Sequence, residues 1–251
     1  MTEVAEFYDA FNARLVRDFL YGNRRVAAQR KFFLRLLDDV QIKTVLVVGC
    51  GIGDVSADLA RALESRGGRV LAVDISEKNV ATAQKLFHRD NLRFECRDII
   101  KAPPQNLVWD LILFPDVYEH IPTAARAELH ATLNSILAPG GAVALTCPTI
   151  QQQRALLATG EGLQVVDEDV SAEDVVHLAH DLQAYLVHFS YLTVFFRHDY
   201  FHALIRRIPD TADLQAYATQ PGYLHRLCLR AYVRLRALLR LRFLKSHDIE
   251  L

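Results

Sequence analysis

The order of apolar and polar residues divides most of the chain into strands that alternate with helices. Short apolar runs predict buried strands at 44–48, 69–73, 92–96, 109–114 and 142–147. Apolar residues at helical spacing predict helices at 54–66, 76–88 and 123–137. Pro139-Gly140-Gly141 is typical of a stop and turn after the last helix. This alternation predicts an α/β fold, a doubly wound and mostly parallel sheet with helices on both faces.

The pattern is different at both ends of this core. Residues 2–40 predict two helices separated by Gly22-Asn23. After Pro148 we expect a polar connection over 150–170 and then a helix over 172–182. Two β-rich runs follow, at 184–196 and 200–208, and they predict a hairpin that adds one antiparallel C-terminal strand to the sheet.

The first strand runs into a glycine-rich loop, TVLVVGCGIGD, with glycines at 49, 51 and 53. Such a loop can bring bare backbone N–H groups against a ligand. The second strand ends in Asp74, 21 residues beyond Gly53, where a ribose-binding carboxylate belongs in a nucleotide-binding unit. The two features together predict an adenosine-containing cofactor. A dehydrogenase fingerprint would need its third glycine one residue later, and a P-loop would need a Gly-Lys-Ser/Thr ending.

Residues 44–208 resemble the class I S-adenosylmethionine-dependent methyltransferases, similar to the O-methyltransferases of ubiquinone biosynthesis. The resemblance is carried by the segments VLVVGCGIGD, VLAVDIS, FECRDI, WDLILFPDVYEHI and LAPGGAVALTCP, in that order. It implies a Rossmann-like core at 44–208, an N-terminal helical cap at 1–43 and a C-terminal basic helical extension at 209–251. It also implies S-adenosylmethionine as the cofactor.

The resemblance also assigns roles around the cofactor. The implied cofactor-binding residues are Tyr8, Gly49, Cys50, Gly51, Gly53, Asp74, Ile75, Asp98, Ile99, Phe114, Pro115 and Asp116. Asp74 would accept the ribose hydroxyls, Asp98 the adenine amino group, and Ile75 and Ile99 would pack on the adenine. Phe114, Pro115 and Asp116 would lie near the sulfonium and amino group. Tyr8 resembles the N-terminal tyrosine that closes over the methionine moiety.

His120 is the predicted catalytic base, together with Tyr8 as the second catalytic candidate. His120 follows the fourth strand at the sheet edge where cofactor and substrate would meet. Its alternative role is to order the loop together with Glu119. A third reading places a divalent metal at Asp116, Glu119 and His120, but Asp116 replaces the first Glu of the metal-binding pattern, and we predict no metal.

The N-terminal helices are expected to cover the site and select the substrate. The candidate lid residues in these helices are Tyr8, Phe11, Asn12, Tyr21, Asn23 and Arg24. Arg24-Arg25 would hold a substrate carboxylate or phosphate, or simply begin a solvated helix.

Composition places further limits on the function. Net charge is −1, but both ends are basic and the middle is acidic. Four cysteines without paired spacing predict reduced, buried thiols, and the absence of a signal-like start or a long apolar run predicts a cytoplasmic protein. Residues 222–246 predict a helix with one arginine face, which would pack on the domain or contact an anionic membrane surface. No nucleic-acid module is found.

The sequence therefore predicts methyl transfer from S-adenosylmethionine to a small molecule, most simply to a hydroxyl or carboxylate oxygen. Nitrogen and carbon acceptors stay open as alternatives. A non-catalytic cofactor-binding scaffold and a dehydrogenase are the competing classes. The acceptor's identity and the oligomeric state are not predicted.

Overall fold

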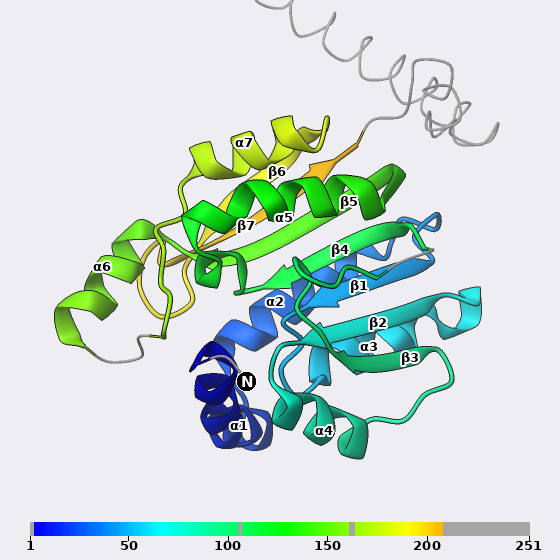
Figure 1. The fold of residues 1–251 in the computed structure, drawn as a ribbon, viewed down its shortest axis with the longest axis horizontal. Coiled ribbons are helices and arrows are strands. Elements are labelled where there is room, and N and C mark those ends of the chain that lie inside the picture. The colour runs from blue at the N-terminus through cyan, green and yellow to red at the C-terminus, as the bar shows by residue number, and fades with distance from the viewer. Residues whose placement is uncertain (1–2, 105–106, 161–163, 208–251) are drawn as a thin grey trace, which may run out of the picture. The chain divides into compact units, whose positions relative to one another are not determined.

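The computed structural model describes residues 3–104, 107–160 and 164–207. The seven strands found in these residues form one sheet, in the order β3-β2-β1-β4-β5-β7-β6 (Figure 1). The strands are β1 (Thr44–Val48), β2 (Arg69–Asp74), β3 (Leu92–Cys96), β4 (Trp109–Pro115), β5 (Leu137–Pro148), β6 (Tyr185–Leu192) and β7 (Tyr200–Arg206). The first five pair in parallel, and β7 runs antiparallel to both β5 and β6. The predicted doubly wound α/β sheet with its late antiparallel strand is confirmed.

Alternate residues of the central strands enter two separate hydrophobic cores, as a sheet covered on both faces requires. Val45 and Val47 of β1 face the core beneath α2 (Arg24–Leu36), α3 (Asp54–Leu63) and α4 (Glu77–Leu86). Leu46 and Val48 face the core beneath α5 (Thr123–Ile136) and α7 (Ala172–Asp181). The continuous apolar runs of the sequence are therefore strands buried on both sides.

Two short 3-10 turns and two further helices complete the described part of the chain. The turns are η1 (Glu64–Arg66) and η2 (Tyr118–His120). The helices are α1 (Glu3–Tyr21) and α6 (Ile150–Thr159), and Figure 1 places both at the end of the sheet where the parallel strands finish. The cap helices α1 and α2 meet at Gly22-Asn23 as predicted, and the Asn23 side chain accepts from the Arg25 N–H at 2.9 Å.

The structure differs from the predicted elements in two places. The expected connection over 150–170 contains α6, whose Gln152 and Gln153 are buried. Pro139-Gly140-Gly141 is not a turn that separates helix from strand, because β5 already begins at Leu137 and this segment is an irregularity in its pairing with β4. The expected cap of α7 is present as a capping box between Ser171 and Asp174.

The expectations for thiols and for the basic tail have separate outcomes. Cys50 and Cys147 are buried free thiols, whereas Cys96 is exposed at the end of β3, so the prediction of buried cysteines was wrong there. Residues 222–246, and Cys228 within them, lie outside the described residues. None of the helices in the described ranges combines the length and apolarity needed to cross a membrane.

Candidate active site

The glycine loop after β1 is tied to β2 and requires glycine for two physical reasons. The N–H groups of Gly49 and Cys50 both donate to the carbonyl of Val73, at 2.8 and 2.9 Å. Gly49, Gly51 and Gly53 have φ values of 72°, 53° and 86°, in the left-handed region that disfavours a side chain. A Cβ at Gly49 would also lie 2.2 Å from Val117. The loop therefore presents bare backbone at the carboxyl edge of the sheet.

Gly53 also leaves no space for a side chain, because it packs against a different residue. A Cβ there would lie 2.5 Å from the ring of Phe94 on β3. Its N–H donates to the Cys50 carbonyl at 3.0 Å, and Gly53 is the N-cap residue just before α3. Gly53 thus allows the loop to pack against Phe94, while Gly49 and Gly51 line the cavity described below.

Asp74 ends β2 with a buried carboxylate that is held from two directions. Its oxygens accept from the N–H of Gly51 at 2.8 Å and from the N–H of Ser76 at 2.9 Å. Burial raises the pKa of Asp74 to about 6, and these two backbone donors oppose that rise. An ionised carboxylate has about four acceptor positions, so this group can still accept from a ligand diol.

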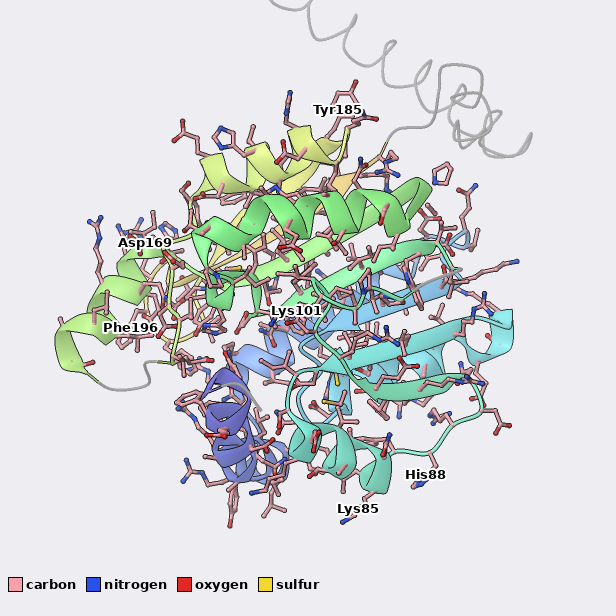
Figure 2. The ribbon with its side chains drawn as sticks, in the orientation of Figure 1. Lys85, His88, Lys101, Asp169, Tyr185 and Phe196 are labelled. Atoms are coloured by element: carbon pink, nitrogen blue, oxygen red, sulfur yellow. The ribbon has the colours of Figure 1, made fainter. Side chains whose placement is uncertain are left out.

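The loop after β3 places Asp98 and Ile99 at the same edge. One Asp98 oxygen accepts from the N–H of Ile100 at 3.0 Å, and the other pairs with Lys101 at 3.1 Å. Lys101, labelled in Figure 2, is a solvent-exposed partner that gives little net stability. Ile99 is buried and Ile75 is half-buried, and both line the cavity, so they supply apolar contact area beside Asp98.

The segment after β4 brings two further acids into the site. Asp116, which is buried, forms an ion pair with the half-buried Arg25 of α2. Glu119 of η2 is 1% exposed, and burial raises its pKa to about 7. Its Oε2 has no hydrogen-bond partner among the described residues. Glu119 is therefore a buried acceptor that is not satisfied within the described protein.

His120 is oriented by the loop that follows α6. Its Nδ1 lies 2.8 Å from the carbonyl of Val166 and 3.2 Å from Oδ1 of Asp167. Because a carbonyl can only accept, Nδ1 carries a proton and Nε2 is the basic nitrogen of the neutral ring. Burial lowers the pKa of His120, but the Glu119 and Asp167 carboxylates outweigh burial and the net change is upward. Nε2 lies 3.8 Å from Glu119.

Helix α1 is fixed over the site by polar contacts with α4. Asn12, which is buried, donates to Oδ1 of Asn79 at 3.0 Å and to Oγ1 of Thr82 at 3.1 Å. Asp9 accepts from the Ser76 hydroxyl and from the Lys78 N–H. The Tyr8 hydroxyl donates to Gln164 at 2.5 Å. Burial and neighbouring acids raise the pKa of Tyr8, so its hydroxyl stays protonated.

These segments enclose a cavity of about 450 Å³. The predicted cofactor and catalytic residues that line it are Tyr8, Gly49, Gly51, Asp74, Ile75, Asp98, Ile99, Pro115, Asp116 and His120. Three predicted residues do not line it: Cys50, Gly53 and Phe114. Of the lid candidates, Phe11 and Asn23 line the cavity, whereas Asn12, Tyr21 and Arg24 do not. Arg25 also lines it, but its guanidinium is paired with Asp116.

Several cavity residues were not predicted from the sequence. They come from α6, the following loop and the start of β7, and include Gln152, Gln153, Gln164, Asp167 and Tyr200. Their only signal in the sequence is a polar stretch, which is equally typical of a solvated connection. Within the described ranges, no group of three or more His, Cys, Asp or Glu is placed to hold a metal ion.

Comparison with known proteins identifies the central part of this chain. Residues 45–141 match a family model described as a methyltransferase domain. The ubiquinone biosynthesis O-methyltransferase of Hydrogenovibrio crunogenus is 29% identical over 139 residues, which are 54% of this chain and 55% of that protein. A probable chloroplastic tocopherol O-methyltransferase of Oryza sativa is 28% identical over 140 residues, 55% of this chain and 38% of that protein. The chain thus spans about half the length, or less, of these curated relatives.

The fold has a close counterpart among solved structures. Magnesium protoporphyrin IX methyltransferase from Synechocystis PCC 6803, solved with bound S-adenosylhomocysteine, matches with a TM-score of 0.61 and 22% identity. The match covers 79% of this chain and 96% of that one. At this identity the likeness concerns the fold alone.

Proposed function

We propose, from the match of residues 45–141 to a methyltransferase-domain model, that the protein is a class I S-adenosylmethionine-dependent methyltransferase and that it methylates a hydroxyl oxygen of a small molecule. The observation that carries the proposal is one cavity whose lining combines two kinds of group. Gly49, Gly51 and Asp74 line it, and so do His120 and Tyr8. A donor and an acceptor could therefore meet between a nucleoside-binding edge and a base.

The residues present fit S-adenosylmethionine. Gly49 and Gly51 both line the cavity and both have positive φ, which supports a role for bare backbone at the cofactor. Asp74 has free acceptor positions for the ribose hydroxyls. The unsatisfied Oε2 of buried Glu119 would gain a partner from a cationic ligand group, because a buried lone acceptor is costly. Asp98 and Ile99 would hold the adenine.

The chain's own groups would position, desolvate and deprotonate. When bound, S-adenosylmethionine supplies an electrophilic methyl group on a sulfur that leaves without needing a proton. Tyr8, Phe11 and Leu15 of α1 would cover the cavity and exclude water. His120 would take the acceptor's hydroxyl proton on Nε2, since Nδ1 is held protonated by the Val166 carbonyl. Glu119 would then stabilise the imidazolium from 3.8 Å.

The charge of the cavity favours a hydroxyl over a carboxylate acceptor. Its lining carries five acids, which are Asp74, Asp98, Asp116, Glu119 and Asp167. The arginines that line it are Arg14, which lies over the Phe11 ring, Arg25 and Arg97, and the last two are paired with Asp116 and Glu95. An anionic acceptor would therefore be repelled, whereas an uncharged hydroxyl compound would not. A hydroxyl also needs the base that His120 supplies, and a carboxylate does not.

A transfer assay with labelled cofactor tests this proposal. Labelled S-adenosylmethionine is offered with separate pools of alcohols and phenols, carboxylic acids, and amines, with and without EDTA. We expect label to enter the hydroxyl pool, and His120→Ala to lower that rate by about 10²- to 10⁴-fold while S-adenosylhomocysteine affinity changes little. Label only in the acid or amine pool, or an unchanged rate in His120→Ala, would contradict the proposal.

A further inference from the structure

Asp116 has a backbone conformation that side-chain-bearing residues rarely adopt. Its φ is 52°, and within the described ranges Gln183 and His198 are the other non-glycine residues with positive φ. Those two are exposed, whereas Asp116 is buried in the cavity wall. A left-handed residue that is not glycine persists only where its surroundings hold it, and such residues gather at functional sites.

A network from α2 and β5 holds Asp116 in this conformation. Oδ1 of Asp116 accepts from the Thr146 hydroxyl at 2.7 Å, and Oδ2 pairs with Arg25. The Asp116 N–H donates to the Thr146 carbonyl at 3.0 Å and approaches its hydroxyl at 3.2 Å. Gln29 donates to the same hydroxyl at 2.9 Å. The Thr146 hydroxyl thus uses its one donor and both acceptor positions.

The turn at Asp116 determines where the next four side chains point. Val117 packs against Gly49, whose added Cβ would lie 2.2 Å from it. Tyr118 is fully buried in the core and lies 2.8 Å from His130 through its hydroxyl. Glu119 and His120 then line the cavity. A change of the Asp116 φ to a negative value would therefore move both Val117, which contacts Gly49, and His120.

We propose that Arg25, Gln29 and Thr146 are positioning residues, which hold the left-handed turn at Asp116 and thereby place Glu119 and His120 in the cavity. The inference rests on the proposed function of His120. It gives the cap helix α2 a role within the site itself, and it assigns the Arg25 cation to the protein's own Asp116 and not to a substrate anion.

Arg25 also balances the negative charge around the base. The groups that face His120 are Glu119 on η2, Asp167 and the Val166 carbonyl in the loop after α6, and Tyr8 on α1. Asp116 raises the pKa of Glu119, and Arg25 is the cation paired with Asp116. Removing the guanidinium leaves an uncompensated carboxylate near this pair, which favours protonated forms.

The test compares Arg25→Met with Arg24→Met, an exposed arginine one position earlier on the same helix. The readouts are the NMR titration of the His120 ring and calorimetric binding of S-adenosylhomocysteine to the full chain. In Arg25→Met we expect the titration to move to higher pH, on the order of half a unit, and affinity to fall several-fold. Arg25→Lys should restore most of the titration shift, and Arg24→Met should match the wild type.

Thr146→Val is the second variant, since it keeps the side-chain volume and every charge but loses the hydroxyl. We expect it to broaden or shift the His120 ring signals with unchanged global fold. An unchanged His120 titration in both Arg25→Met and Thr146→Val would overturn the inference, as would equal effects in Arg24→Met. If the wild type binds S-adenosylhomocysteine in these experiments, the proposed function survives that failure.

Discussion

His202 of β7 is a buried imidazole in an apolar setting. It is 6% exposed, and its ring stacks on Phe32 of α2 with centroids 4.4 Å apart. Burial lowers the pKa of His202 to about 4, and Asp116 opposes that change only in part. The folded state therefore favours the neutral imidazole of His202, whereas the unfolded chain binds the proton more readily.

This environment predicts a loss of stability in mild acid. The unfolded chain takes up the His202 proton near pH 6.5 and the folded chain only near pH 4, so stability falls as pH drops between these values. The expected loss from pH 7 to pH 5 is about 2 kcal/mol from this group. Urea unfolding of wild type, His202→Gln and the exposed-site control His88→Gln checks it. An equal pH dependence in wild type and His202→Gln would contradict the assignment.

Helix α1 covers the site and is held there by contacts with α4 and with the loop after α6. Its cavity-facing side carries Tyr8, Phe11 and Leu15. Its hydrogen bonds to the start of α4 come from Asn12 and Asp9, and Phe19 packs edge-on against Phe87 at the end of α4. A lid held by a few hydrogen bonds can be loosened without disturbing the core.

Loosening α1 should speed the release of the ligand. Asn12→Ala removes the two hydrogen bonds that the Asn12 amide donates to Asn79 and Thr82. It leaves the buried Asn79 oxygen without this donor. We expect the free energy of unfolding to fall by about 1–2 kcal/mol and the dissociation rate of S-adenosylhomocysteine to rise several-fold. Stopped-flow displacement measures the rate, with Arg17→Ala on the exposed side of α1 as the control. Equal rates in all three proteins would show that α1 does not retain the ligand.

Sequence patterns predicted best those elements that are marked by their own residues, without reference to distant parts of the chain. Strands β1 and β2 are continuous apolar runs, and the φ values of Gly49 and Gly51 explain why the loop between β1 and α3 was recognisable. The α6 helix was missed because its buried face carries Gln152 and Gln153, so no apolar period marks it. The ion pair of Arg25 with Asp116 spans 91 positions, and no local pattern predicts such a partner.

The whole described fold converges on the carboxyl edge of the sheet. The glycine loop, Asp74 and Asp98 come from successive strand ends, and η2 comes from the next. The cap helices and the segment from α6 to β7 close the remaining sides (Figure 1). In the proposed function the acceptor would meet segments outside the glycine-loop unit, so we expect a different acceptor to require changes there and not in the glycine loop.

Calorimetric titration with S-adenosylhomocysteine tests the central claim most directly. Asp74 and the glycine loop should give the wild type measurable affinity, and Asp74→Ala should bind at least tenfold more weakly, since it loses the carboxylate that we propose accepts the ribose hydroxyls. The exposed Asp90→Ala is the control, and NAD should not bind. A folded wild type that ignores S-adenosylhomocysteine at millimolar concentration, or binds NAD in its place, would contradict the account.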